Sequence, residues 1–348
     1  MRVKGINYDT GFLNAGTSTH EPFDPEVVRR EMRHIRDDLN CNAVRVTGGE
    51  PARLEIAATH AAGAGLEVWF CPFTNGLTQD ELLDLLADCA ERAERLRQRG
   101  ADVVMLTGSE VSLFTAGFLP GETLEERLAL VADPTRVRAM IGEVRARMND
   151  FLRRAVHVVR ERFGGPVSYA SLPLEGVDWA PFDIIATDAG YRSAATAPHF
   201  RNLIRAFVAQ GRAQGKPVAV TEFGCMSYRG AAATAKDIHS LVVWGDDGRA
   251  DRLNGEYVRD ETEQATYLRE LLDVFEVEGV DAAFVYTFAR YDLPHRDDPR
   301  ADLDAVSCGV VKVFDGQSEA RDPGRRRYPD MPWEPKAAFD TLADCYGR

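Results

Sequence analysis

Residues 217–224, PVAVTEFG, combine an apolar, β-branched run with a carboxylate at its end. Such a run is typical of a strand that is buried on both faces in a parallel sheet. A second stretch, residues 102–110, DVVMLTGSE, has the same design. In a barrel of parallel strands the carboxyl ends of all strands meet on one face. The two stretches therefore predict that Glu110 and Glu222 lie together at that face.

The remainder of the chain alternates apolar strand candidates with amphipathic helix candidates, which is the pattern of a parallel sheet with crossover helices. The eight strand candidates are residues 3–8, 43–46, 66–71, 102–110, 167–170, 184–187, 217–224 and 282–288. Long connections follow the first, fourth, seventh and eighth of these strands. We therefore predict a single (β/α)8 barrel over residues 1–348, with enlarged loops on the face where barrel enzymes bind their ligands.

The composition excludes several classes of protein. The formal net charge of −13 argues against a nucleic-acid or anionic-membrane partner, and no apolar run is long enough to span a bilayer. The opening residues show no secretion signal, and the six cysteines have no paired spacing, so we expect a cytoplasmic protein in a reducing compartment. The excess of arginine over lysine suggests a bacterial source. No ligand spacing indicates a metal, no motif indicates a cofactor, and the oligomeric state is left open.

Paired carboxylates on either side of a cleft suit the cleavage of glycosidic bonds, with one group as acid/base and the other as nucleophile. The second strand contains Arg45, and an arginine inside a barrel strand needs a carboxylate partner. Asn7, Tyr8 and Asp188 end strands on the same face, which makes them candidates for contact with a ligand.

Residues 220–224, VTEFG, resemble the nucleophile motif of clan A glycoside hydrolases, retaining barrel enzymes that include cellulases and mannanases. Divergent chains of this kind are sometimes labelled abortive-infection proteins. The resemblance implies that Glu222 is the nucleophile and that Glu110, at the end of the fourth strand, is the acid/base residue. It also implies that Arg45, within NAVRV at residues 42–46, donates to Glu222.

The same resemblance implies three further positions. Tyr191 matches an aromatic residue or histidine that touches the nucleophile, and Tyr286 or Phe288 takes the place of a tryptophan under the sugar. Ser109 stands where the family has an asparagine that binds the substrate 2-hydroxyl. That contact is therefore lost, moved or unnecessary here, and we expect Ser109 beside an open pocket.

These observations predict a retaining glycosidase or transglycosidase that acts on a small glycoside, glycoconjugate or oligosaccharide. A biosynthetic acid/base enzyme for a sugar-like intermediate and a catalytically silent carbohydrate-binding or defence-associated barrel remain as alternatives. For a retaining enzyme the two carboxyl groups should lie about 5–5.5 Å apart. Arg45 should lower the pKa of Glu222 and leave Glu110 protonated near neutral pH.

Overall fold

The computed structural model describes residues 1–234, 238–245, 247–315 and 326–348. Eight parallel strands form one sheet in the order β7-β6-β5-β4-β1-β12-β9-β8. Their bounds are β1 (Val3–Asp9), β4 (Ala43–Gly48), β5 (Glu67–Pro72), β6 (Val103–Ser109), β7 (Val167–Ala170), β8 (Ile185–Thr187), β9 (Val218–Phe223) and β12 (Ala282–Val285). A parallel bridge between Ser171 and Thr187 brings the two edge strands together. The predicted (β/α)8 barrel is thus confirmed.

Hydroxyl side chains supply much of the bonding between β7 and β8, which we call the seam of the barrel. Ser168 Oγ donates to the carbonyl of Ile184 at 3.0 Å, and Ser171 Oγ donates to that of Ala186 at 2.7 Å. Thr187 Oγ1 donates back to the Ser171 carbonyl at 3.1 Å. The seam therefore closes with fewer ladder bonds between main chains than the pairs at the centre of the sheet.

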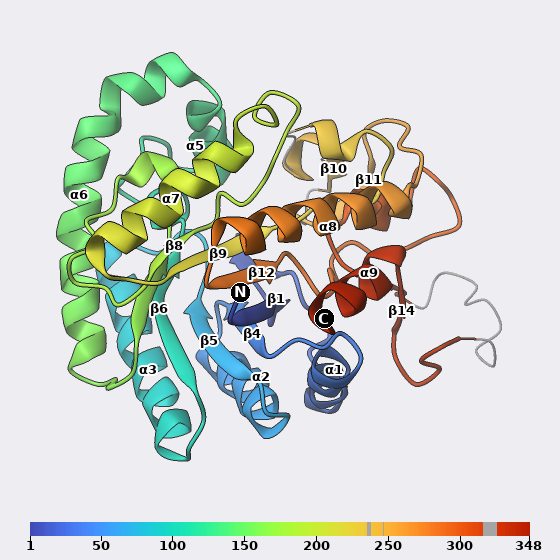
Figure 1. Cartoon of the computed structure of the whole chain (residues 1–348). Coiled ribbons are helices and arrows are strands. Elements are labelled where there is room, and N and C mark those ends of the chain that lie inside the picture. Colours follow the sequence, from blue (N-terminus) through green and yellow to red (C-terminus); the bar gives the residue numbers. More distant parts are fainter. Residues whose placement is uncertain (235–237, 246, 316–325) are drawn as a thin grey trace.

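Helices surround the strands (Figure 1). Within the described residues they are α1 (Pro25–Asp37), α2 (Pro51–Gly63), α3 (Gln79–Gln98), α4 (Val111–Phe114), α5 (Leu124–Val131), α6 (Pro134–Arg160), α7 (Phe200–Gln214), α8 (Glu261–Glu278) and α9 (Ala337–Tyr346). The N-termini of two helices follow from local chemistry: Asp24 caps the first turn of α1, and Thr78 forms a capping box with Glu81 at the start of α3. None of the described helices is long and apolar enough to cross a membrane.

The inside of the barrel is a packed core, distinct from the larger apolar layer between strands and helices. The rings of Trp69 and Phe284 meet at 4.8 Å between centroids and fill its lower part. Gly5 is required there, since a Cβ at this position would come within 2.4 Å of the Phe284 ring. Inward-facing residues alternate along a strand, so Arg45 lies above Ala43 and in register with Asn7 on one side and Trp69 on the other. Arg45 thus begins the polar layer at the carboxyl end of the barrel.

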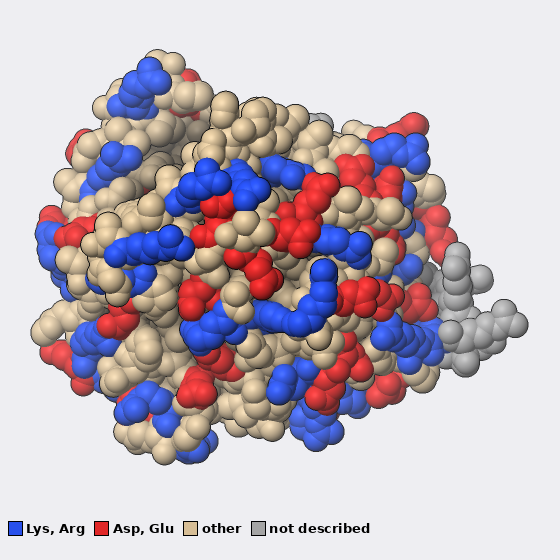
Figure 2. Space-filling view, in the orientation of Figure 1, with Lys and Arg blue, Asp and Glu red and all other residues tan. Residues whose placement is uncertain are grey.

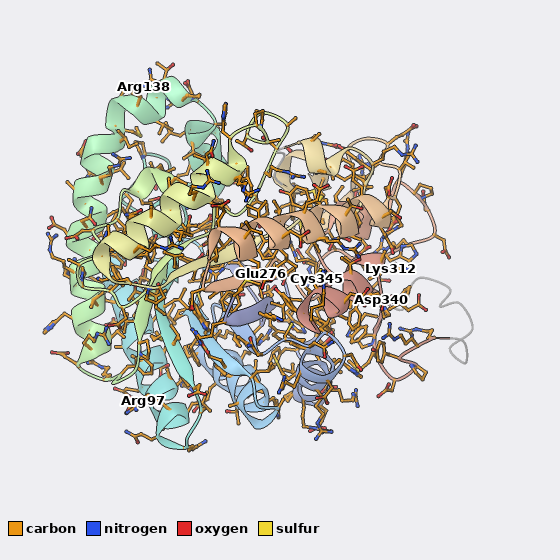
Figure 3. The ribbon with its side chains drawn as sticks, viewed as in Figure 1. Arg97, Arg138, Glu276, Lys312, Asp340 and Cys345 are labelled. Atoms are coloured by element: carbon orange, nitrogen blue, oxygen red, sulfur yellow. The ribbon has the colours of Figure 1, made fainter. Side chains whose placement is uncertain are left out.

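Figure 3 identifies the two ends of the barrel. Arg97, in the last turn of α3, lies near the bottom, where β6 then begins, and Arg138, near the start of α6, lies at the top. The strands therefore end toward the top of this view. The long connections predicted after strands 1, 4, 7 and 8 follow β1, β6, β9 and β12.

The long connections carry small elements of their own. A β10–β11 hairpin (Val242–Trp244 and Ala250–Leu253) follows β9, and β13 (Val311–Val313) pairs with β14 (Trp333–Pro335) after β12. The predicted eighth strand was too long: β12 ends at Val285, although the amide of Phe288 still donates to the carbonyl of Asn7 at 2.9 Å. On the face shown in Figure 2, acidic and basic side chains are interspersed.

Candidate active site

Glu222 and Arg45 form the centre of the polar layer. Glu222 lies on β9, and its Oε1 accepts a hydrogen bond from Arg45 Nη1 at 3.0 Å. The Arg45 side chain is 0% exposed and that of Glu222 is 13% exposed. The buried arginine therefore has the carboxylate partner that its place inside a strand requires, and Glu222 keeps a small part of its surface open to solvent.

Asn7 holds Arg45 in place. Its Oδ1 accepts from Arg45 Nη1 at 3.2 Å, while its Nδ2 donates to the carbonyl of Thr221 at 2.9 Å. The same Arg45 nitrogen also donates to the Thr221 carbonyl at 3.1 Å. Asn7 is 1% exposed and both ends of its amide are engaged. Its position supports Arg45 and the end of β9, in contrast to the ligand contact expected from the sequence.

Asp188 and Ser109 form a second pair beside Arg45. Asp188 Oδ1 accepts from Arg45 Nη1 at 3.2 Å, and Asp188 Oδ2 accepts from Ser109 Oγ at 2.7 Å. The Asp188 side chain is fully buried and Ser109 is 2% exposed. Ser109 therefore does not face an open pocket as expected, because the serine hydroxyl is directed at a buried carboxylate. One guanidinium is shared by Asp188 and Glu222.

Glu110 occupies an unusual backbone position directly after β6. Its φ of 47° and ψ of 39° lie in the left-handed region, which costs a residue with a side chain on the order of 1–2 kcal/mol. Gly108 precedes it at φ 106°, and a Cβ there would come within 2.9 Å of Val111 Cγ2. Such strain is typical of functional sites, where the surrounding structure enforces it.

Burial and neighbouring charges raise the pKa of both glutamates. Burial, followed by the charges of Asp188 and Glu222, raises the pKa of Glu110 well above its usual range. Burial and Asp188 raise the pKa of Glu222 to about 8, against the opposing effects of Arg45 and of a hydrogen bond from Tyr191. Arg45 lowers the pKa of Glu222 as expected, but burial and Asp188, which shares the same cation, outweigh its effect. Arg45 and Tyr191 nevertheless favour ionisation of Glu222 ahead of Glu110.

Two of the predicted aromatic residues lie beside Glu222. Tyr191 is 41% exposed, and its hydroxyl donates to Glu222 Oε2 at 3.4 Å. Tyr286 follows β12, and its hydroxyl accepts from Arg290 Nη1 at 3.3 Å. The charge of Glu222 raises the pKa of both tyrosines, although burial is the larger cause. Both remain candidates for contact with a ligand.

Tyr8 and Phe288 lie elsewhere than expected. Tyr8 is 1% exposed and its hydroxyl donates to Glu31 on α1, and Phe288 is 0% exposed. The Phe288 ring packs against Tyr8 at 6.1 Å and against Trp333 at 5.3 Å between centroids. Both residues therefore belong to the apolar layer between strands and helices, and we do not propose that either contacts a substrate.

Sequence reasoning missed several residues near the site. Arg290 carries a bidentate pair with Asp292, at 2.8 and 2.6 Å, and also donates to Tyr286. Behind Glu110 lie Tyr169 and Glu175, which are described below. Arg290 comes from a long connection and Glu175 from a short turn, while Tyr169 lies on β7, where the apolar run gives no sign of its hydrogen bonds. Only the buried polar atoms of the folded chain reveal them. Within the described residues no group of side chains has the composition of a metal site.

The structure is that of a (β/α)8 barrel with a cluster of carboxylates at the carboxyl end of its strands. No protein-family model and no curated protein matches the sequence. Among solved structures, a β-glucuronidase from Parabacteroides merdae is similar, with 14% identity and a TM-score of 0.55 over 99% of this chain and 36% of that one. The chain therefore spans little more than a third of that enzyme.

Cel5A from Thermotoga maritima is similar over nearly its whole length. Its complex with cellobiose gives 11% identity and a TM-score of 0.53 over 88% of this chain and 97% of that one. Its complex with mannotriose gives 12% identity and a TM-score of 0.52, again over 88% of this chain. At such identities the likeness establishes the barrel fold and leaves the chemistry to be argued from the site itself.

Proposed function

We propose that this protein is a retaining glycoside hydrolase or transglycosidase that acts on a small glycoside or glycoconjugate through two glutamates. The observation that carries the proposal is the unequal environment of Glu110 and Glu222. Glu222 receives hydrogen bonds from Arg45 and Tyr191, which favour its carboxylate form. Burial, together with the charges of Asp188 and Glu222, favours the protonated form of Glu110. Two carboxyls with separated roles are what a double displacement requires.

In the proposed reaction, Glu222 attacks the anomeric carbon while Glu110 gives its proton to the leaving oxygen. The glycosyl-enzyme ester on Glu222 is then broken by water, or by an acceptor hydroxyl, after Glu110 has taken the proton from that nucleophile. Arg45 orients Glu222, and Tyr191 and Tyr286 contact the sugar. The likeness to Cel5A, whose structures hold cellobiose and mannotriose, supports the choice of a carbohydrate substrate.

A panel of aryl glycosides tests this proposal. Glu222→Ala should abolish turnover, while Glu110→Ala should lower kcat/KM by about 10²–10⁴-fold for poor leaving groups and much less for good ones, which need no proton. Azide should rescue Glu110→Ala with a product of retained anomeric configuration. Turnover that persists in Glu222→Ala, or a wild-type product of inverted configuration, would refute the two roles.

A second candidate is acid/base chemistry on a sugar-like molecule without an ordinary 2-hydroxyl. The bond from Ser109 to Asp188 favours it, because the hydroxyl that precedes Glu110 already donates its hydrogen. Substrates with and without the 2-hydroxyl separate the two candidates. Vigorous hydrolysis of an ordinary aryl glucoside, dependent on both glutamates, would refute the second.

A further inference from the structure

The first amides of the turn after Glu110 donate their hydrogen bonds to side chains from another part of the barrel. Glu110 occupies the cap position of α4, but its side chain makes no capping hydrogen bond. In most helices the side chain at that position accepts from the amides of the first turn. Here the Val111 amide donates to the Tyr169 hydroxyl at 2.8 Å, and the Ser112 amide donates to Glu175 Oε1 at 3.0 Å. The carboxyl of Glu110 is thus not needed for capping.

Glu175 is the last residue of a short 3-10 turn, η1 (Pro173–Glu175), that follows β7. It is 0% exposed and accepts three hydrogen bonds, none of them from a cation. In addition to the Ser112 amide, the donors are the Tyr169 hydroxyl at 2.8 Å and the Leu172 amide at 2.8 Å. Burial raises its pKa to about 7. A buried acid without a cationic partner is expensive, which calls for a functional reason.

We propose that Glu175, with Tyr169, is a positioning residue for Glu110, since the pair binds the amides that follow Glu110 and so leaves its carboxyl free for the substrate. The inference rests on the proposed function, because it takes Glu110 as the acid/base residue. It also explains how the left-handed conformation at Glu110 is maintained. The chain after Glu110 is fixed by the hydrogen bonds of the Val111 and Ser112 amides. The Glu110 amide itself donates to the carbonyl of Ala170 at 2.9 Å.

The charge of Glu175 has a second effect. The groups that face Glu110 are Asp188 and Glu222, which raise its pKa most after burial, then Glu175, which also raises it, and Arg45, which lowers it. Loss of the Glu175 charge should therefore lower the pKa of Glu110. A Glu175 that is protonated, and so acts by packing alone, would leave that pKa unchanged when replaced by glutamine.

The test compares three variants. Glu175→Gln removes the charge with little change of shape, and Tyr169→Phe removes the hydroxyl that accepts a hydrogen bond from the Val111 amide. Glu31→Gln is the matched control, because Glu31 is also 0% exposed and accepts from Tyr8, from Tyr291 and from Trp333 Nε1. It removes a buried, multiply bonded carboxylate on α1, away from Glu110.

The first readout is the titration of the Glu110 carboxyl by carbon NMR, with Glu110→Gln used for assignment. We expect Glu175→Gln to shift the pKa of Glu110 downward, and Glu31→Gln and Tyr169→Phe to leave it near the wild-type value. The second readout is kinetic. Both Glu175→Gln and Tyr169→Phe should lower kcat by about tenfold to a hundredfold with little change in KM, since a misplaced acid affects the chemical step more than binding.

An unshifted Glu110 in Glu175→Gln, with a loss of kcat no greater than in Glu31→Gln, would overturn the inference. If Glu175→Gln does not fold, Tyr169→Phe decides: a kcat equal to that of the control refutes the positioning role. Failure of the proposed function gives a different result, namely a wild-type protein that cleaves no glycoside while the titration of Glu110 still responds to Glu175→Gln.

Discussion

Replacement of Arg45 by methionine would test the core of the site, since methionine keeps the length of the side chain and removes its charge. Arg45 Nη1 lies 3.0–3.2 Å from four oxygens, which belong to Asn7, Asp188, Thr221 and Glu222. In the variant Asp188, which is fully buried, keeps only the Ser109 hydroxyl as a donor among these contacts. Removal of one partner of a buried ion pair costs about 3–5 kcal/mol. We expect a loss of this size near pH 8.

The loss should depend on pH. The pKa of Glu222 is already raised to about 8, and removal of Arg45, which lowers it, should raise it further. A carboxyl whose pKa is higher in the folded than in the unfolded state binds more protons when folded. Its stabilising effect is complete below the unfolded pKa, at about pH 4.3, and is lost as the pH rises through the folded value. Up to the folded value of wild-type Glu222, at about pH 8, both proteins lose stability with the same slope, and the difference between wild type and Arg45→Met should therefore grow as the pH rises through and above about 8.

Urea unfolding at several pH values measures this difference. Arg127→Met is a matched control, because Arg127 is 1% exposed but donates to the carbonyl of Leu113 and to Asn75 Oδ1 at 2.7 and 2.8 Å, and not to a carboxylate. Its loss of stability should be nearly constant with pH. A loss below about 1 kcal/mol for Arg45→Met at pH 8, or one as flat with pH as the control, would refute the reasoning, since a broken buried pair should cost several times more.

Three further predictions follow from the site. Tyr191→Phe removes a donor that lowers the pKa of Glu222, so the acidic limb of kcat/KM should move to higher pH, whereas stability should change by no more than about 0.5 kcal/mol because Tyr191 is 41% exposed and the change keeps its ring. An acidic limb at the same pH as in wild type would contradict this prediction. Glu110→Gly should remove the left-handed strain and raise the free energy of unfolding by about 1 kcal/mol while activity is lost, and thermal unfolding with an activity assay checks both effects. Gly108→Ala should lower the free energy of unfolding by about 1–3 kcal/mol, because its Cβ meets Val111. An alanine variant as stable as wild type would show that this contact relaxes freely.

Most of the barrel could be predicted because its strands are continuous apolar runs and its helices have caps and an apolar period. The requirement that Arg45 find a carboxylate predicted an acidic partner, and the resemblance of residues 42–46 implied that this partner is Glu222, which the structure places there. The position of Asp188 between Arg45 and Ser109 could not be predicted in this way, since it depends on the closure of the barrel at the seam. Sequence alone shows that Asp188 ends a strand and not what it touches.

Buried acids on regular elements were also missed. Glu31 lies one residue before Met32 in the apolar stripe of α1, and the sequence gives no reason to place its carboxyl inside the protein. Its donors, Tyr8, Tyr291 and Trp333, come from segments up to 302 residues away. Glu175 is similar, since its donors include the Ser112 amide of the α4 turn, 63 residues away. Long-range hydrogen bonds of this kind leave no local pattern.

The seam between β7 and β8 also determines where the barrel opens most easily. Local openings begin where few main-chain hydrogen bonds hold a strand, and amide hydrogen exchange detects them. We therefore expect the amides of β8 to exchange before those of β4 and β5. A molecule bound across the site should slow exchange at β8, which gives a way to find ligands for this protein without knowing the reaction.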